Sequence, residues 1–283
     1  MMRPTSEPAQ EFSLAPASGG WHCSHLYYSF DRPQLAAMSP AEIAKGREEF
    51  IAALDPKGGD APLRLQVSIV SGNKADFGLM LLDPDPLKID AVHQRLMSSK
   101  LGPALRPGYS FVSVTEISEY VQSVEDYGKR LVAEGESADS PAYQAKVNAY
   151  SDRLVSMNRQ RLTPDLPAYP ATCFYPMNKK RKVGENWFTL SKEERGKLMG
   201  EHARSGMTFA GKVTQLITVG LGFDDWEWGV TLWAANPDYL KEIVYRMRFD
   251  EASARYAEFG TFLVGYVCAA ERVLRHCGVN ATR

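Results

Sequence analysis

The segment from Tyr175 to Lys179 combines three side chains that can take part in chemistry. Tyr175, Met177 and Lys179 lie two residues apart at the end of an apolar run, so in a β-strand they share one face. A phenol, a thioether and an ammonium would then line roughly 13 Å of one surface. The segment therefore predicts one wall of a ligand pocket.

The cations that follow this segment, KKRK at residues 179–182, are typical of nuclear-import or nucleic-acid-binding runs. The chain as a whole has a net charge of −1 and a sequence pI of about 6.5. It therefore has no broad positive field for a nucleic acid. We expect no nucleic-acid partner, and we expect the basic run to serve an anionic ligand close to it.

His202 continues an apolar helical face behind Leu198 in a helix predicted over residues 191–205. A histidine in such a place is often a core side chain satisfied by its neighbours. The functional alternative is an axial ligand to haem iron, which needs a neutral imidazole on a rigid element. The spacing alone does not decide between the two.

Gln215 lies in an otherwise apolar row with Val213, Ile217 and Val219 on one face of a predicted strand. A buried amide needs hydrogen-bond partners, because leaving it unsatisfied costs about 1–3 kcal/mol. Either a neighbouring side chain or a ligand could supply them. Both readings stay open.

Two arginines lie at the ends of predicted helices. Arg161 closes a long central helix, and Arg248 closes a helix shortly before Ser253. A cation is favourable near a helix C-terminus, but arginine also binds carboxylates bidentately. With Lys179, these residues predict a site for a ligand with several carboxylates.

Other candidate chemistry is weaker. His22 and His25 flank Cys23, but in a strand the two histidines face opposite sides. No further ligand lies at a spacing typical of zinc sites, so we interpret them as ordinary strand residues. The sequence has no P-loop, no HExxH, no Ser-His-Asp order and no GxGxxG that opens a βαβ unit.

Two halves of the sequence repeat one order of elements. In the first half, strand-like runs cover residues 22–30, 63–71, 77–82 and 109–117, with capped helices after Ser39 and Asp85. In the second half, runs at 169–177, 212–219, 226–233 and 259–268 alternate with helices after Ser191 and Asn236. We expect Gly206 to end the first of these helices. Each half follows β-α-β-β-α-β, so we predict an α+β fold of two ferredoxin-like units paired into one barrel.

The predicted organisation is a flexible arm (residues 1–20), a first ferredoxin-like unit (21–120), a helical connector (121–165) and a second unit that carries the ligand site (166–283). The arm lacks the features of a signal or transit peptide. The apolar stretch at 262–270 is too short to span a bilayer. The four cysteines show no CxxC spacing. We therefore expect a cytoplasmic protein without a membrane span.

Several motifs then occur in one order: YPMNKKR, NWFTL, EERGKLMGEHARSG, AGKVTQLITVGLGFDDWEWGVTL and MRFDEASARYAEFGTFLVG. Together they resemble the coproheme decarboxylases of the chlorite dismutase superfamily, densely over residues 161–265 and loosely before them. The resemblance implies a homopentamer and a transient contact with a coproporphyrin ferrochelatase. It also implies that hydrogen peroxide drives conversion of iron coproporphyrin III (coproheme), both substrate and redox centre, to haem b with release of carbon dioxide.

The resemblance also implies roles for single residues. Tyr175 matches a tyrosine that, as a radical, takes a hydrogen atom from a propionate, and His202 matches the proximal iron ligand. Gln215 matches the distal glutamine. The residues matched to propionate binding are Arg161, Lys179, Arg248 and Ser253. Met177 matches a side chain that packs near a reactive propionate, and Trp187 matches the aromatic residue beneath the haem.

Two alternatives to decarboxylation remain. A haem peroxidase or a chlorite dismutase-like enzyme could use the same fold, but chlorite-splitting relatives carry an arginine in the place of Gln215. A non-catalytic haem carrier could use the same cavity, but it has no need for a redox tyrosine. The resemblance therefore favours coproheme decarboxylation.

Overall fold

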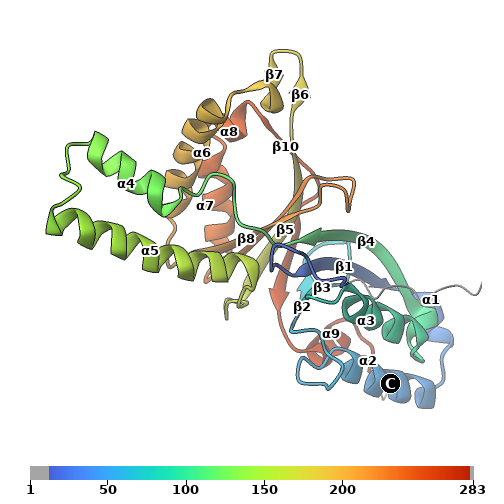
Figure 1. Cartoon of the computed structure of the whole chain (residues 1–283). Coiled ribbons are helices and arrows are strands. Elements are labelled where there is room, and N and C mark those ends of the chain that lie inside the picture. The colour runs from blue at the N-terminus through green and yellow to red at the C-terminus, as the bar shows by residue number, and fades with distance from the viewer. Residues whose placement is uncertain (1–12, 281–283) are drawn as a thin grey trace, which may run out of the picture.

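One continuous sheet joins the two halves of the chain in the computed structural model, which describes residues 13–280 (Figure 1). The first twelve residues of the predicted arm lie outside the described part. The first half contains β1 (His22–Phe30), α1 (Arg32–Ala37), α2 (Pro40–Ala53), β2 (Arg64–Val70), β3 (Phe77–Asp83), α3 (Pro86–Ser98), the short 3-10 helix η1 (Gly102–Ala104) and β4 (Leu105–Val114). Its strands lie in the order β2-β3-β1-β4, which is that of a ferredoxin-like unit.

The second half repeats this arrangement. It contains β5 (Ala171–Lys179), α6 (Lys192–Met207), β8 (Val213–Val219), β9 (Trp228–Ala234), α7 (Pro237–Met247), α8 (Glu251–Ala254), β10 (Ala257–Phe259) and β11 (Leu263–Val267). Strand β5 pairs with β9 and with β11, and β9 also pairs with β8. The predicted closing strand at 259–268 is thus split into β10 and β11. It breaks at Gly260, where a Cβ would meet Pro176 at 2.6 Å.

Two further pairings close the sheet. Val114 of β4 pairs with Val219 of β8, and β11 pairs with β2 through residues such as Gly265 and Val70. Because β5 and β9 also pair, the nine-stranded sheet forms a barrel. The prediction of an α+β barrel built from two ferredoxin-like units is confirmed.

The helix starts follow local capping chemistry. Ser39 with Glu42, and Ser191 with Glu194, form reciprocal capping boxes at the starts of α2 and α6. The predicted stop at Gly206 is wrong, because α6 continues to Met207 and Gly206 does not have a positive φ. A Cβ at Gly206 would lie 3.0 Å from Met247 Cε, so this glycine instead permits close packing of α6 against α7.

The connector contains α4 (Val124–Ala133) and α5 (Pro141–Leu162), which extend away from the sheet in Figure 1. Tyr127 and Tyr150 stack at 4.1 Å between them. After β5, the hairpin of β6 (Arg181–Lys182) and β7 (Glu185–Asn186) turns at Gly184, whose φ is +80°. The 3-10 helix η2 (Trp187–Thr189) follows it. None of the helices within residues 13–280 combines the length and the apolar character needed to cross a membrane.

The last helix, α9 (Ala270–His276), returns to the first half of the chain. Its Val273 and Leu274 are fully buried in the same core cluster as Phe50 and Phe77. The backbone carbonyls of Cys277 and Val279 accept hydrogen bonds from the first half, from Arg32 and Arg47. The core of the first unit therefore includes residues from the end of the chain.

His25 points into the barrel, where it stacks on Phe174 with ring centroids 4.0 Å apart. Its Nε2 lies 2.8 Å from the Thr231 hydroxyl, and burial lowers the pKa of His25 to about 3. His22 is half-buried and its Nε2 contacts the Leu14 carbonyl instead. In the described part of the chain these histidines belong to no group of metal-ligating side chains, and His25 is a core residue.

Candidate active site

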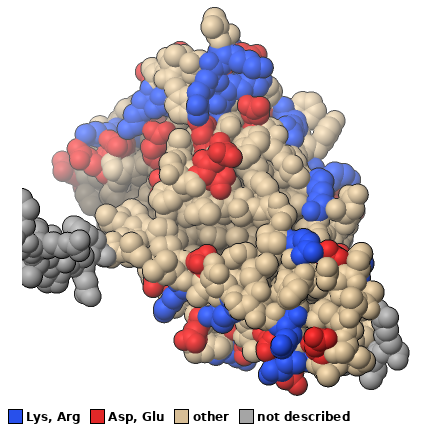
Figure 2. Space-filling view, turned by 90° about the vertical axis from the view of Figure 1, so that its right-hand side faces the viewer, with Lys and Arg blue, Asp and Glu red and all other residues tan. Residues whose placement is uncertain are grey.

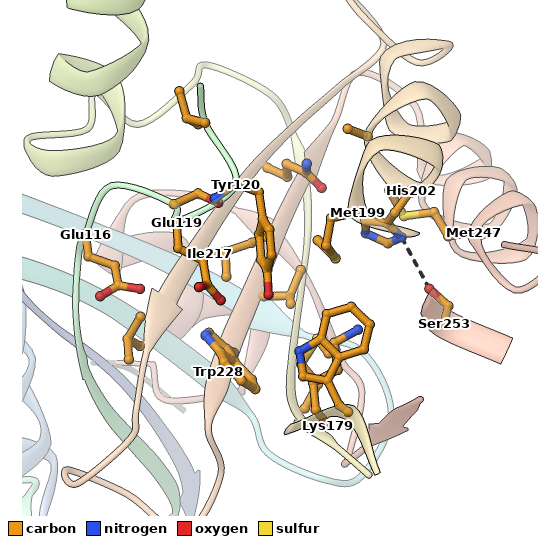
Figure 3. Close-up of a pocket in the computed structure, with 18 of the residues that line it drawn as sticks. Glu116, Glu119, Tyr120, Lys179, Met199, His202, Ile217, Trp228, Met247 and Ser253 are labelled. Atoms are coloured by element: carbon orange, nitrogen blue, oxygen red, sulfur yellow. Dashed lines mark hydrogen bonds between the residues drawn. The ribbon is translucent and has the colours of Figure 1, made fainter. Parts of the chain in front are cut away.

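A cavity of about 630 Å³ lies on the outer face of the second unit's sheet, under α6 and α7. This volume lies within the range of about 300–1,000 Å³ that is usual for ligand pockets. The cavity brings together every site residue that the sequence predicted: Arg161, Tyr175, Met177, Lys179, Trp187, His202, Gln215, Arg248 and Ser253. Figure 3 shows Lys179, His202 and Ser253 on one side of the cavity.

Tyr175 lies on the cavity wall that β5 provides. Its side chain is almost fully buried, and it stacks on Phe262 with ring centroids 4.4 Å apart. Burial, with a smaller contribution from Cys173, raises the pKa of the Tyr175 phenol well above its usual value, although Arg248 acts in the opposite direction. The phenol therefore stays protonated at neutral pH and is suited to give up a hydrogen atom rather than to act as a base.

Lys179 ends β5 on the same face. Its ammonium lies 4.1 Å from the centre of the Trp187 ring and donates to the Ala252 carbonyl at 3.1 Å. Burial lowers the pKa of Lys179 to about 8, although the carboxylates of Asp250 and Glu227 oppose this change. Of the basic run, only Lys179 lines the cavity. The prediction that the whole run binds the ligand is therefore wrong, because β6 carries the next cations away from the cavity.

His202 is not a core histidine. None of the residues of α6 is fully buried, and the His202 side chain is 23% exposed. The ring projects from α6 toward the cavity (Figure 3). The alternative of a satisfied core side chain is thus wrong, because the His202 side chain lines the cavity and stays partly exposed there.

Asp250 determines which ring nitrogen of His202 carries a proton. Its carboxylate, 1% exposed, lies 3.0 Å from His202 Nδ1, and the Ser253 hydroxyl lies 3.3 Å from the same atom. Burial alone raises the pKa of Asp250, but hydrogen bonds from His202 and Ser253 bring it below its usual value. Since an ionised carboxylate only accepts hydrogen bonds, Nδ1 carries a proton, and Nε2 is the nitrogen whose lone pair is free in the neutral ring.

This lone pair suits a metal that brings its other ligands with it. A histidine that ligates a metal usually donates its second ring N–H to a carboxylate or carbonyl. Within residues 13–280, no group of three or more His, Cys, Asp or Glu side chains is placed to hold a bare ion. The site therefore offers one imidazole nitrogen, which suits a metal that arrives with most of its ligands already in place.

Gln215 is exposed to the cavity rather than buried in the sheet. The expectation of a buried amide is wrong, because this face of β8 forms the cavity wall at Gln215. Ile217 and Val219 of the same row also line the cavity. No described side chain or backbone group forms a hydrogen bond with the Gln215 amide in the structure, which leaves the amide available to a ligand.

Arg161 and Arg248 bring two more positive charges to the cavity. The Arg248 guanidinium lies 4.0 Å from the centre of the Phe259 ring, and burial lowers the pKa of Arg161. Among the described residues, Arg161, Lys179 and Arg248 have no acidic side chain within ion-pair distance. Three cations without described acidic partners, beside apolar side chains such as Val230 and Met247, fit a large apolar ligand with carboxylates at its edge.

Several lining residues were missed by the sequence analysis. Glu116, Glu119 and Tyr120 follow β4, which ends earlier than predicted and releases them from the sheet toward the cavity (Figure 3). Burial, followed by the charge of Glu119, raises the pKa of Glu116. Asp250 was missed because its partner His202 is 48 residues away. The one local signal for Asp250 is its position as N-cap of α8.

The fold and the cavity together define a class of protein. It is a barrel of two ferredoxin-like units with a site for a large anionic ligand beside one accessible imidazole. The chain belongs to the chlorite dismutase family, whose family model matches residues 41–268.

Individual relatives agree with this assignment. A coproheme decarboxylase of Staphylococcus carnosus (strain TM300) is 38% identical over 259 residues, which cover 89% of this chain and 93% of that protein. A solved structure of a heme-binding protein from Thermus thermophilus is 32% identical, with a TM-score of 0.74 and coverage of 92% of this chain and 95% of that chain. The resemblance to the coproheme decarboxylases is confirmed.

A more distant relative shows the fold alone. The chlorite dismutase from Candidatus Nitrospira defluvii, solved in complex with imidazole, is 15% identical with a TM-score of 0.68. The match covers 94% of this chain and 98% of that chain. The barrel is thus shared with proteins of very different sequence.

Proposed function

We propose that this protein is a coproheme decarboxylase, which uses hydrogen peroxide to convert two propionates of iron coproporphyrin III to vinyl groups and so forms haem b. One observation carries the proposal: a single cavity is lined by Tyr175, by His202 with Asp250 paired behind it, and by three cations without acidic partners among the described residues. The related S. carnosus protein is a coproheme decarboxylase, which supports the same substrate here.

Most of these lining residues would bind the porphyrin, and a few would take part in the reaction. His202 Nε2 would ligate the iron, and Gln215 and Trp187 would pack against the porphyrin. Arg161, Lys179, Arg248 and Ser253 hold propionates, with Met177 packed beside the reactive one. Iron coproporphyrin, once bound, supplies the redox chemistry with peroxide as oxidant.

Tyr175 carries the reactive step. As a radical, its oxygen takes a hydrogen atom from the propionate carbon next to the ring, while Lys179 holds the carboxylate. For each propionate, the carboxylate, one hydrogen peroxide and one proton give a vinyl group, one carbon dioxide and two waters. Each decarboxylation therefore takes up one proton.

Product masses after incubation with coproheme and hydrogen peroxide test this function. We expect the stepwise loss of two carboxyl groups and the formation of haem b. Unchanged coproheme together with rapid oxygen release from chlorite would favour a chlorite-degrading enzyme instead. Porphyrin binding without either reaction would leave a haem carrier.

Replacing Arg248 by alanine should weaken coproheme binding more than haem b binding. Coproheme has four carboxylates and haem b has two, and one charge-assisted contact contributes about 1.5–3 kcal/mol. We therefore expect a loss of about 10–100-fold in coproheme affinity, measured by titration of both porphyrins. Arg246→Ala, on the same helix but outside the cavity lining, is the matched control. Equal losses of affinity for both porphyrins would show that Arg248 does not bind the propionates that haem b lacks.

Replacing Asp250 by asparagine should weaken the bond between His202 and iron. The amide can donate to Nδ1 and so place the ring proton on Nε2, the atom that must ligate. Loss of such a partner typically costs 10–100-fold in metal affinity, so we expect about that loss in coproheme titrations. Asp238→Asn, at an exposed position on α7, should change nothing. Native affinity and a native ferrous spectrum in Asp250→Asn would contradict this role.

The family resemblance also supports a cytoplasmic homopentamer that meets a coproporphyrin ferrochelatase transiently. Two observations are consistent with these proposals. Tyr245 and Phe249 form an edge-to-face pair on the surface and are 66% and 67% exposed, as expected of side chains at a subunit interface. All four cysteines are free thiols, as is usual in a reducing compartment.

A further inference from the structure

Glu227 is a buried acid that the proposed reaction does not use. It precedes β9, is 3% exposed and does not line the cavity. Its carboxylate accepts the backbone N–H of Lys179 at 2.8 Å and pairs with the guanidinium of Arg181. A buried carboxylate is strongly destabilising unless it is paired and hydrogen-bonded, so these contacts explain how Glu227 is tolerated but not what it does.

The backbone of Glu227 makes two more contacts with the same region. Its N–H donates to the Asn178 side-chain oxygen at 2.8 Å, and its carbonyl accepts from the Gly220 N–H at 2.8 Å. The loop between β8 and β9 is thereby fastened to the end of β5. All of these contacts lie at the end of β5, where the chain passes from the cavity wall to the β6–β7 hairpin.

Lys179 is the last residue of β5, and its backbone and its side chain take different directions. Its backbone is held by Glu227, whereas its side chain turns back over Trp187 into the cavity. The next cations continue into the β6–β7 hairpin, at the top of the molecule in Figure 1, and Figure 2 shows Lys and Arg side chains gathered there. Lys179 is also paired with Ala257 of β10, so Glu227 adds a side-chain anchor to the strand pairing at this point.

We propose that Glu227 is a positioning residue for Lys179: by binding the Lys179 backbone and Arg181 together, it directs the Lys179 ammonium to the carboxylate of the bound porphyrin. This inference rests on the proposed function for its ligand. It assigns Glu227 a role that requires no contact with that ligand.

The charges around Lys179 are consistent with this arrangement. Burial lowers the pKa of Lys179, whereas Asp250 and Glu227 both favour its ammonium form. Arg181 pairs with the other oxygen of the Glu227 carboxylate, so removing Glu227 would take away a negative charge and leave a positive one. The ammonium form of Lys179 would then be lost at lower pH than in the native protein.

Three variants test the proposal. Glu227→Gln keeps an oxygen for the Lys179 N–H but loses the charge, and Glu227→Ala loses both. Glu185→Gln is the matched control, because Glu185 pairs with Lys180 in the same hairpin and is half-exposed. Coproheme affinity is measured across a pH series. In protein without ligand, modification of the Lys179 amine by an amine-reactive reagent is followed by mass spectrometry.

We expect Glu227→Ala to lose about tenfold in coproheme affinity, corresponding to one charge-assisted contact. Glu227→Gln should bind almost natively at about pH 6.5, and as the pH rises it should lose affinity at lower pH than the native protein, because Lys179 deprotonates earlier. Modification of Lys179 should be faster in both variants and unchanged in Glu185→Gln. Native binding, pH dependence and labelling in a folded Glu227→Gln would overturn the proposal, as would an equal effect of Glu185→Gln.

The labelling experiment separates this proposal from the proposed function. If native protein does not decarboxylate coproheme but Lys179 labelling still depends on Glu227, then the function fails and the positioning role stands. If native protein forms haem b and the rate of Lys179 modification is unchanged in the Glu227 variants, then only the positioning role fails.

Discussion

Tyr175→Phe is expected to bind coproheme and to leave its propionates intact. The substitution preserves the ring, which is 6% exposed and stacks on Phe262, and removes only the O–H. That hydroxyl forms no hydrogen bond within the described part of the chain, so its loss should change stability and affinity little. We expect carbon dioxide release to fall by at least about 1,000-fold, which corresponds to about 4 kcal/mol in the activation barrier.

Two measurements check this result. Titration should give near-native affinity for coproheme, and product masses after addition of peroxide should show all carboxyl groups retained while the porphyrin slowly bleaches. Tyr256→Phe is the matched control, because Tyr256 is also buried and packs edge-to-face on Trp187, yet it does not line the cavity. Rapid formation of haem b by Tyr175→Phe would place the radical on another residue.

His202→Ala should lose the bond between the protein and iron while keeping the fold. Loss of an outer partner of a ligand costs about 10–100-fold in metal affinity, so loss of the ligand itself should cost at least about 100-fold. The ferrous absorption spectrum should change in form, because the axial ligand is replaced by water or by nothing. Free imidazole, added to the variant, should restore much of the native spectrum.

The same variant has a second effect that needs a control. Removing His202 leaves Asp250 buried with one fewer hydrogen-bond donor, which should cost about 1–3 kcal/mol in unfolding free energy. In the double variant His202→Ala/Asp250→Asn, the stability should recover in part while the altered spectrum remains. A native ferrous spectrum in His202→Ala would point to a different iron ligand.

The parts of the molecule that follow local rules could be predicted from the sequence. Alternation along a strand placed Tyr175, Met177 and Lys179 on one face, and capping boxes located the starts of α2 and α6. The repeated order of strands and helices was sufficient to predict the barrel. In each case the deciding contacts lie within a few residues or within one repeat.

Predictions failed where distant contacts decide the outcome. Gly206 resembles a helix stop, but its lack of a side chain is used for packing against Met247. Gln215 lies in an apolar row that would be buried under a helix in a filled core, whereas here it faces a cavity. The pairing of Asp250 with His202 spans 48 residues, and no local pattern in the sequence reports it.

The return of α9 to the first unit has a consequence for the order of folding during synthesis. Val273 and Leu274 complete the core that contains Phe50 and Phe77, and β11 supplies the neighbour of β2. The N-terminal unit leaves the ribosome long before these residues exist, so its β2 edge stays unpaired and part of its core stays open to water. Such edges and apolar surfaces are prone to aggregation. We therefore expect the nascent chain to be most prone to aggregation in the interval between synthesis of β4 and synthesis of α9.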